Sequence, residues 1–251
     1  MSERSLILKQ NLLKDRDMKI DKVMIAGVDN DTPIEELERL TEKYPFVEWG
    51  VLFSKHKMGQ KRYPDLNYIH QLCKAEVGLM SAHFCGAYPR EILEKGDISE
   101  ASHWGAYFES IQLNYNFSRS SKWSWENFHR ITDELAVDVI LQHNRSNAPY
   151  LKHKEFLTSN PHLRFLYDAS GGRGTEIKHI ENPLWNNYTG YAGGIHKDNV
   201  ERLCKIIKKK PSLRTVWIDL ESGARDENNR FSIKNAETIL GRASKYVSEK
   251  S

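Results

Sequence analysis

The feature that most constrains the fold of this chain is a repeating pattern of short apolar runs, each followed by a polar turn and a segment of helical periodicity. The runs recur about every 25 to 35 residues. Such an alternation of strands and helices, without a long low-complexity linker, predicts an α/β protein. We expect a single-domain (β/α)8 TIM barrel over residues 19–251. Residues 1–18 are expected to form a short N-terminal extension. An open doubly wound sheet is the alternative. The expected strands are Lys22–Gly27, Phe46–Phe53, Val77–Phe84, Ser110–Asn116, Val137–His143, Arg164–Asp168, Thr189–Gly194 and Thr215–Leu220.

Charge and cysteine usage narrow the class of protein. The 37 Lys+Arg residues nearly balance the 34 Asp+Glu residues, which favours neither a nucleic-acid partner nor a membrane surface. The three cysteines lack CxxC spacing, so neither a zinc site nor a disulfide framework is indicated. The first apolar run is too short for a signal peptide or a membrane span. We expect a cytoplasmic protein, monomeric or homodimeric, without a cofactor or metal.

Polar residues gather where the expected strands end. In a (β/α)8 barrel the active site is built from the C-terminal ends of the strands and the turns after them. His83 and His143 end strands there, and imidazole titrates near neutral pH, so both are candidate catalytic residues. Asp168 ends an apolar strand before a glycine-rich turn and is the third. Taken singly, each histidine could equally be a hydrogen-bonded structural residue.

Small residues follow the last two strands. Gly193 and Gly194 come after one, and Ser222 and Gly223 after the other. Loops at these two positions bind phosphate in many such barrels, because backbone N–H groups and a helix N-terminus point at the anion. The pattern predicts a small-molecule phosphorylated ligand, with tight turns alone as the alternative.

Six motifs occur in a distinctive order: "KVMIAGVDN", "KRYPDL", "SIQLNY", "LYDASGGRGTEI", "YAGGIHKDNV" and "WIDLESGA". In this order they resemble phosphoribosylanthranilate isomerase, a barrel enzyme of the tryptophan pathway, over most of the chain from Lys22 onward. The resemblance implies an Amadori rearrangement of a ribosylamine, with a cysteine on the first strand as general base and an aspartate on the sixth as general acid.

Several residues fall on the family's functional positions. Asp168 falls on the general acid, and Arg62 on the arginine that contacts the substrate's anthranilate. The resemblance also implies which residues form the phosphate-side loops: Gly172, Gly174, Gly193, Gly194, Ser222 and Gly223. Further candidate substrate contacts are Asp29, Asn114, Arg173 and Glu221.

The chain departs from the family pattern at two positions. Ala26 stands where the family has its cysteine, and Asn114 where it has a histidine. Alanine cannot carry a proton, and loss of a general base commonly costs about 10²–10⁴ in rate. Three hypotheses follow. The chain is an isomerase of a phosphorylated sugar or ribosyl phosphate with a relocated base, or a catalytically inactive phosphate-ligand-binding or regulatory homologue, or a poor catalyst of the family reaction. The candidates for a relocated base are His83, His143, Asp29 and Glu221.

Two other classes of function are open. A metal-dependent barrel enzyme would use His83, His143 and Asp168 with Asp219 or Glu221 as ligands, although no HxH or HExxH spacing supports it. The stretch "SRSSKWSWENFHR", 118–130, mixes aromatic and basic residues and could stack on nucleic-acid bases. The spacing of Trp125 and Phe128 instead favours the buried face of a helix capped by Ser124.

Overall fold

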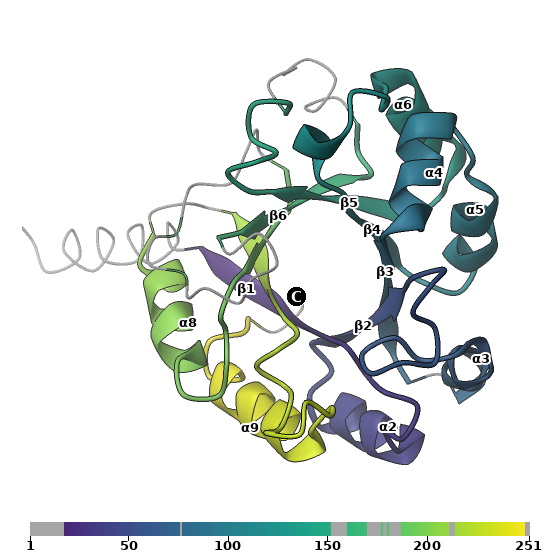
Figure 1. The fold of residues 1–251 in the computed structure, drawn as a ribbon. Coiled ribbons are helices and arrows are strands. Elements are labelled where there is room, and N and C mark those ends of the chain that lie inside the picture. The colour runs from purple at the N-terminus through teal and green to yellow at the C-terminus, as the bar shows by residue number, and fades with distance from the viewer. Residues whose placement is uncertain are drawn as a thin grey trace, which may run out of the picture.

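The fold is a closed barrel of eight parallel strands. The computed structural model describes residues 18–75, 77–151, 160–169, 177, 180, 187–210 and 214–248. Each strand pairs with the next along the chain, and β8 pairs with β1 (Figure 1). The predicted TIM barrel is therefore confirmed, and the open sheet is excluded. The strands are β1 Lys19–Ala26, β2 Val47–Phe53, β3 Leu79–Cys85, β4 Ser110–Asn114, β5 Asp138–His143, β6 Leu163–Asp168, β7 Thr189–Ala192 and β8 Thr215–Leu220.

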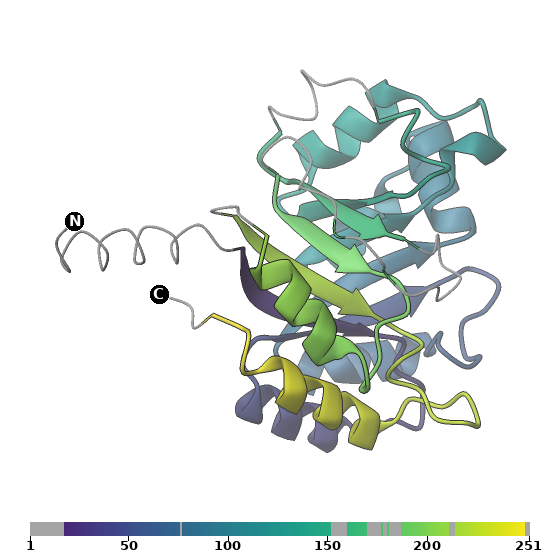
Figure 2. The same ribbon diagram turned by 90° about the vertical axis from the view of Figure 1, so that its left-hand side faces the viewer.

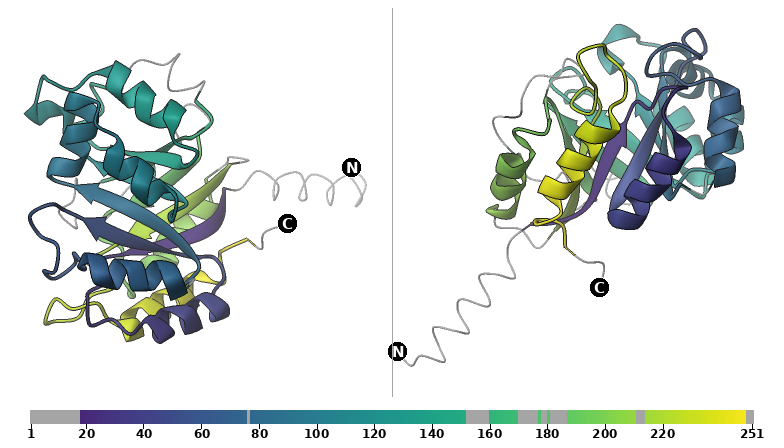
Figure 3. Two further views of the ribbon diagram at one scale, coloured as in Figure 1. Left: turned by 90° about the vertical axis from the view of Figure 1, so that its right-hand side faces the viewer. Right: turned by 90° about the horizontal axis from the view of Figure 1, so that it is seen from below.

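Helices surround the barrel on the outside, as the side views show (Figures 2 and 3). Their apolar faces pack on the outward-facing side chains of the strands. Helix α6 begins as the sequence predicts, because Ser124 Oγ accepts a hydrogen bond from the Asn127 N–H, and Phe128 is buried beneath it. The described helices are α2 Ile34–Lys43, α3 Leu66–Ala75, α4 Ala87–Lys95, α5 Ser99–Gly105, the short 3-10 helix η1 Phe117–Arg119, α6 Trp125–Glu134, α8 Val200–Lys208 and α9 Ile233–Ala243.

The inside of the barrel is divided into three layers. Successive side chains of a strand point to opposite faces, so every second residue points inward. At mid-height an apolar layer is formed by Met24, Ile140, Leu166 and Trp217, all buried. Toward the N-terminal ends of the strands lie the ion pairs Lys22–Glu48 and Arg164–Asp138. Toward the C-terminal ends the inward residues are polar and line a pocket.

The described part of the chain begins at Met18, one residue before β1. Residues 1–17 of the expected extension lie outside the described residues. Met18 is fully buried, and its N–H donates to the carbonyl oxygen of Lys210 at 3.2 Å. Met18 is therefore part of the barrel. Among the described residues, no helix combines the length and apolar character that a membrane crossing requires.

The inner apolar layer depends on a glycine. A Cβ added at Gly190 would lie 2.2 Å from Trp217 Cε2. We expect Gly190→Ala to lower the free energy of unfolding by about 1–3 kcal/mol or more, measured by urea unfolding, because an overpacked core must shift. The control is Gly105→Ala in α5, where the added Cβ would make an ordinary 3.6 Å contact with Val137. Equal stability of the two variants would contradict this packing.

Candidate active site

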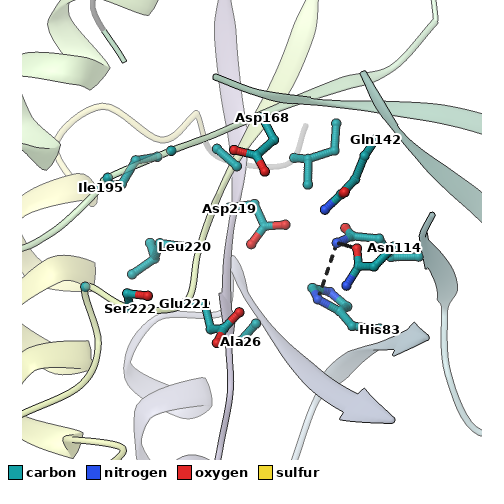
Figure 4. Close-up of a pocket in the computed structure, with 16 residues that line it drawn as sticks. Ala26, His83, Asn114, Gln142, Asp168, Ile195, Asp219, Leu220, Glu221 and Ser222 are labelled. Atoms are coloured by element: carbon teal, nitrogen blue, oxygen red, sulfur yellow. Dashed lines mark hydrogen bonds between the residues drawn. The ribbon is translucent and has the colours of Figure 1, made fainter. Parts of the chain in front are cut away.

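A pocket lies at the C-terminal ends of the strands, above the apolar layer (Figure 4). Its cavity volume is about 110 Å³. It brings together most of the sequence-predicted residues that the structure describes: His83, Asn114, Asp168, Gly193, Gly194, Glu221, Ser222 and Gly223. The other lining residues are Ala26, Gln112, Gln142, Leu166, Ala192, Ile195, Asp219 and Leu220.

Two buried carboxylates enter the pocket from neighbouring parts of the barrel wall. Asp168 ends β6 and Asp219 lies on β8, and both pair in register with Ala192 of the strand between them. Each is only 5% exposed. Burial raises the pKa of Asp219 well above its ordinary value, and the negative charges of Asp168 and Glu221 raise it further. Asp219 is therefore a weaker acid than an exposed aspartate. From the sequence alone, Asp219 is a candidate metal ligand only.

His83 lies in the pocket but is a poor base. Its side chain is 4% exposed, and its Nε2 lies 3.1 Å from Met24 Sδ. Burial, with a smaller contribution from the positive charge of Lys22, lowers the pKa of His83 to about 3. The ring is thus neutral at any physiological pH and accepts a proton reluctantly. This argues against His83 as the relocated base.

His143 does not line the pocket, contrary to our expectation. On β5 the inward positions belong to Ile140 and Gln142, as the apolar layer and the pocket lining show. The alternation of the strand therefore turns His143 to the outside of the barrel. There its ring packs on Tyr167, with 4.4 Å between the ring centroids. Its neighbour Gln142 takes the place in the pocket that we assigned to His143.

Amide side chains form one wall of the pocket. Figure 4 shows Asn114 and Gln142 facing Asp168 and Asp219 across it. Gln112 lies beside Asn114 on β4, and its Nε2 donates to Asn114 Oδ1 at 2.9 Å. Our sequence-based prediction missed Gln112 and Gln142. The signal that could have found Gln112 is its separation of two residues from Asn114, which places both on one face of a strand.

Asp29, a predicted substrate contact, is not among the described lining residues of the pocket and is the centre of a buried ionic cluster. Its carboxylate accepts hydrogen bonds from Arg225 Nη2 and from the backbone N–H groups of Arg62 and Phe231. Asp29 and Arg225 are 7% and 2% exposed as side chains. The cluster ties together the loops that follow β1, β2 and β8. It thereby holds Arg62 at the edge of the pocket in a left-handed backbone conformation, with φ of 74°.

The guanidinium of Arg62 is already paired with side chains of the protein. Its Nη1 donates to Glu221 Oε1 at 2.5 Å and its Nη2 to Asn229 Oδ1 at 2.8 Å. Glu221 lines the pocket, whereas Arg62 does not. The guanidinium that the resemblance assigns to the aromatic part of a substrate is therefore neutralised by Glu221.

The loops after β7 and β8 approach each other closely. Gly193 and Gly194 both have positive φ, 124° and 57°. A Cβ at Gly223 would lie 1.9 Å from the carbonyl oxygen of Ile195, so only glycine fits there. Asn199 Nδ2 donates to the Gly194 carbonyl oxygen at 2.8 Å just before α8. Gly172, Arg173 and Gly174, predicted for the phosphate side and for substrate contact, lie outside the described residues.

The metal alternative finds no ligand set in the part of the chain that the structure describes. No three His, Cys, Asp or Glu residues there are grouped as ligands for an ion. His143, one of the expected ligands, faces away from the other candidates.

Comparisons with known proteins bear on the fold. Neither the known protein families nor the curated proteins include a match to the sequence. Among solved structures, phosphoribosyl anthranilate isomerase from Thermotoga maritima is similar, with a TM-score of 0.58 and 16% identity over 90% of this chain and 99% of that one. The enzyme from Thermus thermophilus has a TM-score of 0.57 and 18% identity, over 89% and 98%.

A third similar structure includes a ligand. It is a phosphoribosyl anthranilate isomerase in complex with reduced 1-(o-carboxyphenylamino)-1-deoxyribulose 5-phosphate, with a TM-score of 0.56 and 16% identity over 90% of this chain and 99% of that one. At such low identities these similarities show the shared barrel fold.

The ionic cluster gives a prediction for stability. Burial alone would raise the pKa of Asp29, but the hydrogen bonds from Arg225, Arg62 and Phe231 outweigh it and lower the pKa. Asp29→Asn leaves the Arg225 charge buried without its partner. We expect the free energy of unfolding at pH 7 to fall by about 3–5 kcal/mol in urea titrations.

The pH dependence follows from the direction of this shift. Because the native carboxyl is the stronger acid, its stabilisation is complete above the unfolded-state pKa of about 3.9 and is lost as the pH falls through the lower native pKa. The difference between wild type and Asp29→Asn should be constant from pH 8 to 5 and shrink below about pH 4. Asp31→Asn is the control, because Asp31 is 64% exposed. An equal loss in both variants would argue against the cluster.

Proposed function

We propose that this protein is an isomerase-type enzyme that acts on a phosphorylated sugar or ribosyl phosphate by general acid–base catalysis. The observation that carries the proposal is the pair of buried carboxyl groups, Asp168 and Asp219, in one pocket, where burial and the neighbouring negative charges raise the pKa of Asp219. Two acidic groups whose environments separate their pKa values are a common way to place an acid and a base in one site. The similar barrels that are phosphoribosyl anthranilate isomerases agree with this class of reaction.

The two carboxyl groups take complementary roles. Asp219, the protonated group, gives its proton to the ring oxygen at C1 and opens the sugar. Asp168 then removes the proton from C2, which yields an enol or enolamine. Asp168 returns this proton to C1, while Asp219 takes the proton of the C2 hydroxyl as the ketone forms. Both groups end the cycle in their starting states, as an isomerisation requires.

This assignment changes the roles that the resemblance implies. The family pattern would make Asp168 the acid and leave the base position empty at Ala26. With Asp219 as the acid, Asp168 is available as the base, and no histidine is needed. The loops of Gly193, Gly194, Ser222 and Gly223 line the same pocket and supply the phosphate end.

A second candidate is a ligand-binding protein without turnover. The observation that favours it is that Ala26 lines the pocket, at the position where the resemblance implies a cysteine as general base. Binding of sugar phosphates without proton exchange would support this alternative.

Removal of either carboxylate should abolish catalysis. We expect Asp168→Asn and Asp219→Asn each to lower the rate of C2 proton exchange of ribose 5-phosphate by at least about 10²-fold, followed by NMR in D2O. The wild-type rate should fall as the pH rises through the raised pKa of Asp219.

Urea unfolding of the same variants shows whether a loss of activity results from lost catalysis or from lost folding. Because Asp219 is costly to bury as an ion, Asp219→Asn should unfold at a urea concentration no lower than that of wild type. Glu227→Gln, an exposed change in the loop after β8, is the control for activity. If Asp168→Asn exchanges the C2 proton at the wild-type rate, Asp168 is not part of the mechanism.

Restoring the family's base provides a separate test. Gly50 leaves room beside Ala26, since a Cβ at Gly50 would lie 2.6 Å from Ala26 Cβ. We expect Ala26→Cys to raise isomerase activity toward phosphoribosylanthranilate above the wild-type level, measured by loss of substrate fluorescence. Ala26→Ser, which adds a similar volume without an acidic thiol, is the control. Efficient turnover of this substrate by wild type would show that no base was lost.

A further inference from the structure

The pocket wall presents hydrogen-bond acceptors and negative charge. Its acidic side chains are Asp168, Asp219 and Glu221, and among the described lining residues there is no lysine or arginine. Among the described residues, the guanidinium of Arg62 is held by Glu221 and Asn229, and that of Arg225 by Asp29. These two cations are therefore already paired within the protein.

Gln112 adds a buried acceptor without a partner. It is 2% exposed, and its Oε1 is buried and makes no hydrogen bond. An unsatisfied buried acceptor costs about 1–3 kcal/mol, so a ligand that donates to it gains affinity.

The orientation of the Gln112 amide follows from its neighbours. The Cys85 thiol donates to the His83 carbonyl oxygen, so its sulfur accepts from Asn114 Nδ2 at 3.1 Å. Asn114 Oδ1 is then the acceptor for Gln112 Nε2 at 2.9 Å. The same Nε2 lies 3.5 Å from Nδ1 of His83, whose other nitrogen faces Met24 Sδ. With its N–H groups directed at Asn114 and His83, Gln112 is left with its oxygen as the polar atom of this pocket-lining side chain that has no partner.

A ligand that fits this wall must donate hydrogen bonds and must not add negative charge at this end. We propose that the substrate is a sugar phosphate whose sugar end carries a C2 hydroxyl group and a protonated amine at another carbon, and that Glu221 and Gln112 select against a carboxylate there. This rests on the proposed function and names its substrate class. An aryl carboxylate would meet Glu221 instead of a free Arg62, and like charges brought together in a partly buried site repel strongly.

Binding to the wild-type protein tests the selectivity. Calorimetric titrations would use four probes: inorganic phosphate, glucose 6-phosphate, glucosamine 6-phosphate, and reduced 1-(o-carboxyphenylamino)-1-deoxyribulose 5-phosphate. Glucosamine 6-phosphate carries its amine at C2 and serves only as a binding probe for the charge. We expect glucosamine 6-phosphate to bind about tenfold more tightly than glucose 6-phosphate, and the aryl carboxylate to bind more weakly than both.

Variants identify the residues responsible. Glu221→Gln should abolish the preference for the amine and strengthen binding of the aryl carboxylate about tenfold or more, because Arg62 is released. Gln112→Leu should weaken the binding of both hexose phosphates and leave the affinity for inorganic phosphate unchanged. Glu227→Gln makes the same charge change at an exposed position outside this pocket and should leave all four affinities unchanged.

The outcomes separate the two proposals. If no phosphorylated probe binds, the proposed function fails and the selectivity fails with it. If the sugar phosphates bind but the aryl carboxylate binds most tightly, or if Glu221→Gln changes nothing, the proposed function stands and the selectivity is overturned.

Discussion

The strict alternation of inward and outward side chains in a closed barrel is the constraint on which the rest of this structure depends. It sends Met24, Ile140, Leu166 and Trp217 into one apolar layer that fills the barrel at mid-height. That layer is the floor of the pocket. Without it, water could reach the carboxyl group of Asp219 from below, and the burial that raises its pKa would be lost.

The arrangement of strands is predictable from the sequence because it depends on local patterns. Apolar runs of strand length, polar turns and glycines after the last two strands are enough to give eight strands, a barrel and the end at which the pocket lies. Which strand-end residues enter the pocket is harder to predict. It depends on the phase of the alternation, and an error of one residue reverses the direction of a side chain. His143 and Gln142 are adjacent, and only the second enters.

The pairing of charges could not be predicted from local patterns. Asp29 and Arg225 are 196 residues apart, and Arg62 is 159 residues from Glu221. A strand-end aspartate of the first loop looks the same in sequence whether it meets a ligand or a guanidinium. The family resemblance gave the position of Arg62 but not its partner. Likewise, Asp219 fits the family motif, yet its raised pKa results from the burial that only the fold creates.

The apolar layer has a consequence for how such a chain can change. It separates the ionic network at the N-terminal ends of the strands, with Lys22–Glu48 and Arg164–Asp138, from the acidic mouth at the other end. Effects of substitutions at sites that share no contacts are nearly additive. Packing changes at one end therefore need little compensation at the other. Changes of charge do cross the layer, because Lys22 lowers the pKa of His83 and Glu48 raises that of Asp219, so a new ligand at the mouth constrains which ion pairs the opposite end can carry.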